Sequence, residues 1–273
     1  MSYKNQHFIS YGDDRPKAVE RIKKQAESFN TFTTIDVYNN NNIYDDEFKE
    51  KYNYVLNQRR GGGYWLWKYY LINKKMKEIG EGEYIIYCDA GCELNNKGIT
   101  RYYEYLDMLK NSEYGVISFP LQWNKQFEPP PSNGCVERVW TTRQIFDYFN
   151  IDINSDIATS PQIAATVMIF KKCNHSLKIL EEYGKIMNFD QKLTTDYYNR
   201  INQYPFFKEN RHDQSLWGVL RKKYGSILLE NDESFFYFQK FIGNQTIYNY
   251  TDNPERFKYP FWATRDTSGK SVY

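Results

Sequence analysis

The first half of the chain alternates short apolar runs with longer segments of helical period, and this alternation restricts the possible folds more than any other feature of the sequence. The helical pattern is clearest in PKAVERIKKQAESF (16–29), where apolar residues recur every three or four positions. Four segments have the pattern of strands: HFISYGD (7–13), TTIDVY (33–38), EGEYIIYCDAG (81–91) and YGVISFP (114–120). Strands that alternate with helices form a largely parallel sheet with helices on both faces. The sequence therefore predicts an α/β fold with a mixed, mostly parallel sheet.

The second half also contains helical and strand patterns, and no internal repeat or low-complexity linker divides the chain. EPPPSNG (128–134) is expected to form a loop. Helices are expected at 46–58, 64–79, 98–111, 137–150, 175–187 and 212–225, and one more strand at 165–172. A length of 273 residues suits one large α/β domain or two small ones. Without a linker, a single domain over residues 1–273 is the simpler interpretation.

The charge balance and the cysteines argue against several classes of function. The 36 basic and 34 acidic residues give a net charge of +2, which offers no reason to expect a nucleic-acid partner. No apolar run has membrane-spanning length and no signal peptide is recognisable, so a cytoplasmic protein is expected. The four cysteines form no CxxC pair, which argues against zinc and a disulfide framework. Aromatic residues reach 18%, which suits sugar ligands and follows equally from AT-rich codon usage.

The strand pattern EYIIYCDAG ends on a single carboxylate, Asp89, followed by two very small residues. Ligands of open α/β sheets bind beyond the carboxyl ends of the strands. A carboxylate at that place binds a divalent cation, which in turn bridges a diphosphate. Ala90 and Gly91 would leave room for a bulky ligand and let the backbone approach it. The alternative is a surface aspartate in an ordinary turn.

A run of three glycines precedes the helix expected from Tyr64, within RRGGGYWLWK (59–68). Free N–H groups at a helix start bind anions, and a glycine run would expose them. Arg59, Arg60 and Lys68 add positive charge to the same segment. The alternative is a flexible loop that leads into a core helix.

NRHDQSLWGVL brings an imidazole, a carboxylate and an amide together at the start of the helix expected at 212–225. His212, Asp213 and Gln214 suit the binding of sugar hydroxyls or a metal, or action as a base. Asp213 also fits a structural role as the N-cap of that helix.

These three segments resemble the nucleotide-sugar glycosyltransferases of the GT-A fold, a Rossmann-like α/β fold. The most similar members are short bacterial and giant-virus glycosyltransferases with an RGxGYWxWK segment, a DAG motif in the place of DxD, and a later HDQS. Glycogenin-like transferases have a similar order of a basic helix residue, an acidic strand end and a DQ pair. The resemblance covers residues 5–225 and depends on the combination of motifs.

The resemblance implies a role for each matching residue, and it makes residues 1–120 the nucleotide-binding half. Residues 121–273 would then form the acceptor and donor-sugar half with a C-terminal lid. The implied donor contacts are Tyr11 and Asp13 at the nucleotide base, Arg60 and Lys68 at the ribose or diphosphate, Asp89, Ala90 and Gly91 at the DxD position, Gln162 at the donor sugar or acceptor, and Arg265 in the lid. The implied catalytic residues are Asp213 and Gln214, and the implied metal ligands are Asp89 and His212.

One departure from the family pattern concerns the metal. Gly91 stands where the family has the second aspartate of DxD, so one expected ligand is missing. Glu93 or His212 would have to complete the ligand shell, or basic residues would replace the metal. Mn²⁺ or Mg²⁺ is still the expected cofactor, with a UDP-sugar as donor and a glycan as acceptor.

The resemblance therefore predicts a hexosyl- or N-acetylhexosaminyltransferase. A nucleotidyltransferase that makes a sugar nucleotide is a weaker alternative, because the first strand leads into the acidic YGDDRP (11–16) and not into a basic glycine loop. A non-catalytic carbohydrate-binding protein and a glycosidase with Asp89 and Asp213 as its carboxylate pair are further alternatives. The sequence does not choose the base, the sugar, the acceptor, the stereochemistry or the oligomeric state.

Overall fold

The central element of the fold is a six-stranded sheet with the strand order β2-β1-β3-β6-β5-β7. The computed structural model describes residues 3–13, 15–39, 43–121, 135–234, 238–242, 245–249 and 254–265. The strands of the sheet are β1 (Gln6–Tyr11), β2 (Thr34–Tyr38), β3 (Tyr84–Asp89), β5 (Val116–Ser118), β6 (Val167–Lys171) and β7 (Ile227–Leu228). Only β6 runs antiparallel to its two neighbours, and the other pairs are parallel. The predicted mixed, mostly parallel α/β sheet is confirmed.

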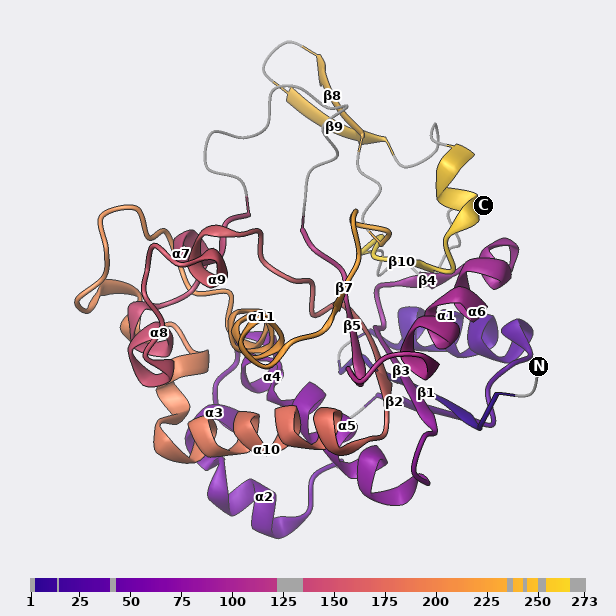
Figure 1. Ribbon diagram of the computed structural model, residues 1–273, viewed down its shortest axis with the longest axis horizontal. Coiled ribbons are helices and arrows are strands. Elements are labelled where there is room, and N and C mark those ends of the chain that lie inside the picture. Colours follow the sequence, from indigo (N-terminus) through magenta and orange to yellow (C-terminus); the bar gives the residue numbers. More distant parts are fainter. Residues whose placement is uncertain are drawn as a thin grey trace.

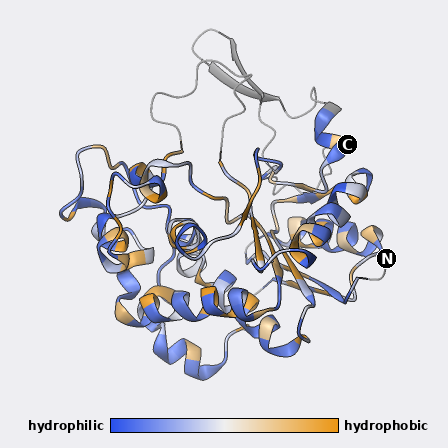
Figure 2. Cartoon of the chain, in the orientation of Figure 1, coloured by the Kyte–Doolittle hydropathy of each residue, from blue (hydrophilic) through white to orange (hydrophobic). Residues whose placement is uncertain are grey.

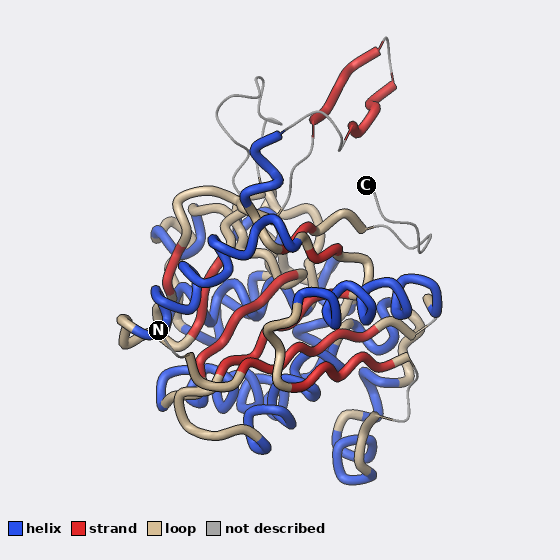
Figure 3. Tube along the Cα trace, turned by 90° about the vertical axis from the view of Figure 1, so that its right-hand side faces the viewer, coloured by secondary structure: helices blue, strands red, loops and turns tan. Residues whose placement is uncertain are grey.

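Helices cover both faces of this sheet (Figures 1 and 3). One face carries α1 (Pro16–Phe29) and α6 (Ile99–Lys110), and the other carries α5 (Leu66–Glu78), α10 (Asn174–Phe189) and α11 (Asp213–Tyr224). The helix predicted at 16–29 has the same bounds in the structure. Asn30, with a φ of 54°, ends it in the left-handed region that short polar residues tolerate.

Two hydrophobic clusters, one on each face, hold the layers together. Successive residues of β3 contribute alternately, so that Ile85 and Tyr87 lie in one cluster and Ile86 and Cys88 in the other. A strand covered on both faces needs apolar residues throughout, which explains the continuous run of this segment. Figure 2 shows the same distribution, with apolar residues along the sheet and polar residues on the outer sides of the helices.

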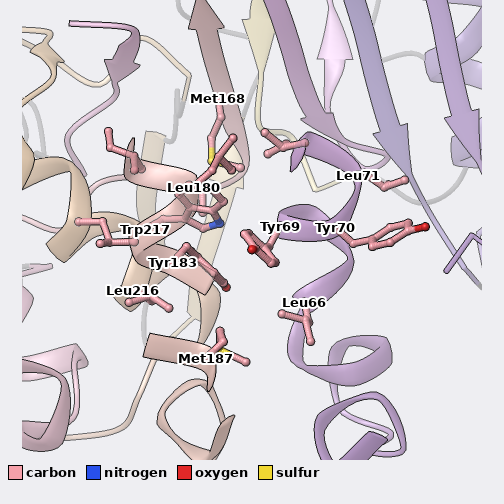
Figure 4. Packing of buried hydrophobic residues seen from close by; sticks show 14 of the residues in the cluster. Leu66, Tyr69, Tyr70, Leu71, Met168, Leu180, Tyr183, Met187, Leu216 and Trp217 are labelled. Carbon is pink, nitrogen blue, oxygen red and sulfur yellow. The ribbon is translucent and has the colours of Figure 1, made fainter. Parts of the chain in front are cut away.

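Aromatic rings join α5, α10 and α11 beneath the sheet. The Tyr69 ring stacks on the Tyr183 ring with centroids 4.6 Å apart, and Tyr183 lies 4.6 Å from Trp217. Figure 4 shows these rings among Leu66, Leu180 and Met187. This packing fixes the start of α11 relative to α5, and both helices contribute to the site described below.

Two segments predicted as single helices are each divided in the structure. The segment 137–150 forms α7 (Glu137–Trp140) and α8 (Arg143–Phe149), because the Thr142 side chain accepts a hydrogen bond from the Gln144 N–H and starts a new helix. The segment 46–58 forms α2 (Asp46–Lys51) and α3 (Asn53–Leu56). Both single-helix predictions were wrong at the junction. The loop predicted at 128–134 lies outside the described residues.

The C-terminal part returns to the sheet beside the end of β3. There β10 (Phe261–Trp262) pairs antiparallel with β4 (Glu93–Leu94). The remaining elements are α4 (Gly61–Tyr64), α9 (Asp156–Thr159), β8 (Phe238–Ile242), β9 (Gln245–Asn249), and the 3₁₀ helices η1 (Asn96–Gly98), η2 (Gln191–Thr194), η3 (Tyr197–Arg200) and η4 (Pro254–Lys258). Among the described helices, none is long and apolar enough to cross a membrane.

Candidate active site

Asp89 is the last residue of β3, as the sequence pattern indicates, and it pairs in the sheet with Tyr11, the last residue of β1. Because β1 and β3 are parallel, both residues lie at the same edge of the sheet. The Asp89 side chain is 28% exposed, and its Oδ1 accepts a hydrogen bond of 2.6 Å from the Tyr87 hydroxyl. The carboxylate is thus fixed at the edge where ligands of α/β sheets bind.

A buried lysine joins Asp89 to the start of α11. The Lys68 Nζ lies 3.2 Å from Asp89 Oδ1 and 3.0 Å from Asp213 Oδ2. It also donates a hydrogen bond of 3.2 Å to the carbonyl oxygen of Ala165. Lys68 is 3% exposed and Asp213 is 4% exposed. Three segments far apart in the sequence therefore meet at one ammonium group.

Burial changes the acid–base properties of this cluster. It raises the pKa of the Asp213 carboxyl to about 6, although the Lys68 ammonium acts in the opposite direction; the charge of Asp89 adds to the rise. Burial would lower the pKa of Lys68, but the carboxylates of Asp213 and Asp89 outweigh it and hold that pKa above its ordinary value. The lysine therefore stays charged.

Asp213 is not the N-cap of α11. That position belongs to His212, whose side chain makes no capping hydrogen bond, and Asp213 is the first helical residue. The backbone of His212 has φ 57° and ψ −121°, a conformation that non-glycine residues rarely adopt. Such a strained turn persists only where the surroundings enforce it. Here it precedes the carboxylate that contacts Lys68.

The glycine run forms a left-handed turn. All five residues from Gly61 to Trp65 have positive φ, between 50° and 87°. The N–H groups of Gly62, Gly63, Tyr64 and Trp65 donate to the backbone carbonyls of Arg59, Gln58, Arg60 and Gly61 respectively. The expectation that the run presents free N–H groups to an anion is therefore wrong for these four amides, because the left-handed turn bonds them internally.

The turn instead organises a cluster around Asp196, which the sequence analysis missed. The Asp196 carboxylate accepts hydrogen bonds from Arg60 (2.8 and 2.9 Å), from the Tyr64 hydroxyl (3.0 Å) and from His212 Nε2 (2.9 Å). The Trp65 ring stacks on the His212 ring at 5.2 Å. Asp196 lies in the polar stretch TTDYYNR (194–200), where no pattern distinguishes it.

Arg60 and His212 thus lie together, and both bind Asp196 and not the Lys68 cluster. Hydrogen bonds to His212, Arg60 and Tyr64 keep the pKa of Asp196 below its ordinary value, although burial alone would raise it. Burial lowers the pKa of His212, against the effect of Asp196. A neutral His212 donates from Nε2 to this carboxylate, which leaves Nδ1 as its lone-pair nitrogen.

A chain of buried polar groups lies behind Gln214. The Gln214 Nε2 donates to Gln162 Oε1 (2.9 Å), and the Gln162 Nε2 donates to Glu137 Oε1 (3.0 Å). Glu137 also forms an ion pair with Lys222, at 2.8 Å. Gln162 and Gln214 were expected to face the same ligand, and the structure brings them into contact. Glu137 was missed, because it resembles an ordinary acid in the first turn of a helix.

The remaining expected residues lie at or after the ends of β1, β3 and β10. The Tyr11 ring lies 4.4 Å from the Trp67 ring, and Asp13 is exposed in the turn after β1. A Cβ atom at Gly12 would lie 2.8 Å from the Ala90 Cβ, so the small size of Ala90 is explained by this protein contact. The Gly91 carbonyl accepts a hydrogen bond from the Thr264 hydroxyl at 2.9 Å, and the exposed Arg265 follows directly.

The side chains described at this edge do not fit a metal site built by the protein. Asp89 Oδ1 and Asp213 Oδ2 both face the Lys68 ammonium, and His212 Nε2 is bonded to Asp196. Within the described ranges, no group of three His, Cys, Asp or Glu side chains could hold a metal ion. Glu93 is buried, on β4. The Lys68 ammonium therefore lies between one oxygen of Asp89 and one oxygen of Asp213.

No protein-family profile matches the sequence, and no curated protein matches it. Several solved structures are similar. A glycosyltransferase involved in the glycosylation of the major capsid of PBCV-1 has a TM-score of 0.47 and 10% identity, over 94% of this chain and 91% of that chain. Mouse xyloside xylosyltransferase 1 has a TM-score of 0.44 and 10% identity, over 86% of this chain and 87% of that chain. The galactosyltransferase LgtC, in complex with donor and acceptor sugar analogues, has a TM-score of 0.38 and 12% identity, over 84% of this chain and 75% of that chain.

Proposed function

We propose that this chain is a glycosyltransferase that moves a sugar from a nucleoside-diphosphate sugar to a hydroxyl group of a glycan, and UDP-sugars are the first donors to test. The observation that carries the proposal is the Lys68 ammonium, held between Asp89 and Asp213 at the carboxyl ends of β1 and β3. A cation fixed at this edge of an α/β sheet suits a ligand with a charged diphosphate.

The proposed chemistry creates charge where this cluster can act on it. In glycosyl transfer the bond between C1 and the phosphate oxygen breaks, and its electron pair leaves with the diphosphate. The acceptor oxygen forms the new bond to C1, and its proton passes to a base. We assign to Lys68 the stabilisation of the leaving diphosphate, since a preorganised cation in a site shielded from water acts strongly on developing charge.

Asp213 is proposed to stabilise and not to act as the base. Its Oδ2 is directed at the Lys68 ammonium, whereas a base must present an oxygen to the proton of the acceptor hydroxyl. Asp89 is more exposed and lies closer to the solvent side of the same ammonium. This arrangement favours a mechanism in which the two carboxylates hold the lysine in place.

We assign no step to a divalent cation, because the described side chains do not assemble a ligand shell for one. Mn²⁺ or Mg²⁺ remains a prediction from the sequence resemblance, and the assay below measures its effect directly. The division into a nucleotide half and an acceptor half also remains a proposal. Lys68 and Asp89 come from residues 1–120, and Asp213 and Gln214 come from residues 121–273.

The alternatives explain fewer of these contacts. A nucleotidyltransferase would need basic groups after β1, where Asp13 lies exposed. A glycosidase with Asp89 and Asp213 as its carboxylate pair would leave the Lys68 ammonium between them without a role. A carbohydrate-binding protein has no use for a buried cation at this edge of the sheet.

The test is a screen of nucleotide sugars for hydrolysis and transfer, with manganese and with a chelator. Lys68→Met should lower the rate about 100-fold, since it removes a charge that stabilises the leaving group. Lys75→Met is the matched control: Lys75 lies on the same helix and pairs with Asp36 and Glu78, away from Asp89 and Asp213. It should retain activity within about threefold, since partly exposed ion pairs contribute little.

Two outcomes would contradict the proposal. One is that folded protein neither binds nor hydrolyses any nucleotide sugar in the screen. The other is that Lys68→Met, shown to be folded by circular dichroism, is as active as the Lys75→Met control. Release of pyrophosphate from a nucleoside triphosphate would favour the nucleotidyltransferase instead.

A further inference from the structure

The buried polar groups behind Gln214 form a chain with a defined direction. It begins at the partly exposed amide of Gln214, continues through Gln162, which is 1% exposed, and ends at Glu137, which is 0% exposed. The two hydrogen bonds of the chain measure 2.9 and 3.0 Å. The proposed stabilisation of the leaving diphosphate by Lys68 does not require these hydrogen-bonded side chains, so their role needs a separate explanation.

The direction of the chain follows from the chemistry of its inner end. An ionised carboxylate can only accept hydrogen bonds. Glu137 forms an ion pair with the Lys222 ammonium (2.8 Å), and the Thr141 hydroxyl donates to its Oε1 (2.6 Å). Gln162 must therefore turn its NH₂ group inward. A second contact agrees, because the Gln162 Nε2 also lies 3.5 Å from the carbonyl oxygen of Trp140, another pure acceptor.

The orientation of Gln162 determines that of Gln214. Since the Gln162 carbonyl oxygen faces outward, Gln214 must direct its own NH₂ group toward it. The Gln214 carbonyl oxygen then remains for a ligand, and among the described residues none donates a hydrogen bond to it. Gln214 follows Asp213, whose carboxylate contacts Lys68, so both side chains start from the first turn of α11.

The helix is shaped to accommodate the inner end of the chain. Gly218 lies one turn beyond Gln214 on α11, and a Cβ atom there would lie 2.8 Å from Glu137 Oε2. Lys222, one turn further along the same helix, reaches this carboxylate. The side of α11 that follows Gln214 thus provides both the space for Glu137 and its counter-ion.

We propose that Glu137 is a positioning residue that fixes, through Gln162, the amide orientation of Gln214, so that the site selects a ligand group able to donate a hydrogen bond. Building on the proposed function, this group is one hydroxyl of the transferred sugar. Glu137 itself does not touch the sugar. It sets specificity by making the outer end of the chain a hydrogen-bond acceptor.

Replacing Glu137 by glutamine should reverse the whole chain. Lys222 remains charged, and only the carbonyl oxygen of the new amide can accept a hydrogen bond from it, so this oxygen should turn toward the ammonium. The new NH₂ group then faces Gln162, which must rotate to accept, and Gln214 rotates in turn. Gln214 would now present NH₂ to the ligand, without any change in side-chain size.

The first test uses the donor found in the nucleotide-sugar screen and its analogues in which one sugar hydroxyl at a time is replaced by fluorine, which accepts but does not donate. In the natural protein, one position should lose about tenfold in kcat/KM on fluorination. In Glu137→Gln the loss at that position should shrink to less than twofold. Thr141→Val is the matched control. This substitution removes a hydroxyl that donates to Glu137, but the Glu137 carboxylate remains an acceptor. It should lower stability and leave the tenfold discrimination unchanged.

A neutron structure tests the orientation without any turnover, since it locates the amide deuterons. The natural protein should show the Gln214 nitrogen toward Gln162, and Glu137→Gln should show the Gln214 oxygen there. The opposite orientation in the natural protein, or an unchanged one in Glu137→Gln, would overturn the inference even if no donor sugar had been found. Retention of the tenfold discrimination in Glu137→Gln would also overturn it.

Discussion

At the scale of single residues, the charges around Lys68 determine both the chemistry that the site can perform and its effect on the free energy of folding. One ammonium faces two carboxylates in a region nearly closed to water. Ion pairs of this kind often do not repay the loss of hydration, so their presence is weak evidence for stability. The raised pKa of Asp213 indicates that its ionised form is held at a cost in free energy. The cost is understandable where the charges serve a ligand.

That cost gives a prediction for stability against pH. The pKa of Asp213 is about 6 in the folded protein, whereas aspartate in an unfolded chain has a pKa near 4. Between these values the folded state binds the proton more tightly, so the free energy of unfolding falls as pH rises from 4 to 6. The contribution lost is ~3 kcal/mol at 1.36 kcal/mol per pKa unit. The Asp213→Asn protein has no titrating group at this position, so its stability does not include this pH-dependent contribution.

Urea unfolding at pH 4.5 and pH 7.5 measures the effect as a difference between two proteins. Asp213→Asn should gain stability relative to the natural protein by ~2 kcal/mol between these pH values, while its transferase activity falls. Titrating groups that do not interact with Asp213 cancel in the difference. A stability difference that is the same at both pH values would show that Asp213 is not held at a raised pKa.

At the scale of elements, the glycine turn shows where inference from sequence succeeds and where it stops. A glycine triplet before an apolar helix correctly indicates an unusual backbone, and α5 follows it as expected. The hand of the turn, and its internal hydrogen bonds, depend on contacts with distant residues. Asp196 binds Arg60 and Tyr64 on both sides of the triplet, and no local pattern announces that contact.

The same limit applies to the polar chain behind Gln214. Gln214 was identified by its place beside His212 and Asp213, and Gln162 by the family resemblance. Their partner Glu137 lies at the start of α7, which the helical pattern at 137–150 merged with α8. A buried acid and a surface acid have the same letter in the sequence. Only the fold shows that Glu137 lies against Gly218 and Lys222.

Two alanine substitutions separate the backbone strain of the turn from its packing. Gly62 has φ 54°, and the nearest atoms to an added Cβ lie 3.7 Å away, so Gly62→Ala meets only the left-handed penalty of about 1–2 kcal/mol. Gly63 has φ 87°, and its Cβ would lie 3.0 Å from the Leu56 Cα, a backbone atom. Gly63→Ala should therefore lower the free energy of unfolding by more, which urea unfolding measures. Equal effects of the two substitutions would contradict the packing argument.

At the scale of the whole molecule, the alternation of strands and helices determines most of the architecture. It predicts the parallel strands β1, β2, β3 and β5 and the helices between them, because short connections and two-sided burial leave few other arrangements. The antiparallel direction of β6 is not encoded locally, since its apolar residues suit either direction. The site follows from the topology, as parallel strands bring their carboxyl ends to one edge.

The return of the C-terminal segment to this edge is the last feature with a testable consequence. A Cβ atom at Gly98 would lie 2.3 Å from the carbonyl carbon of Tyr259, so Gly98→Ala should push the segment at 254–265 away from β4. Amide hydrogen exchange should then rise in this segment and stay unchanged in β1 and β3. If the segment closes over the donor, as the position of Arg265 in the sequence resemblance implies, KM for the nucleotide sugar should also rise.

Gly80→Ala is the control, because its Cβ would meet only the flexible end of Glu83 at 3.3 Å. Unchanged exchange at 254–265 in Gly98→Ala would show that this contact does not hold the segment, and faster exchange with an unaltered KM would show that the segment is no lid.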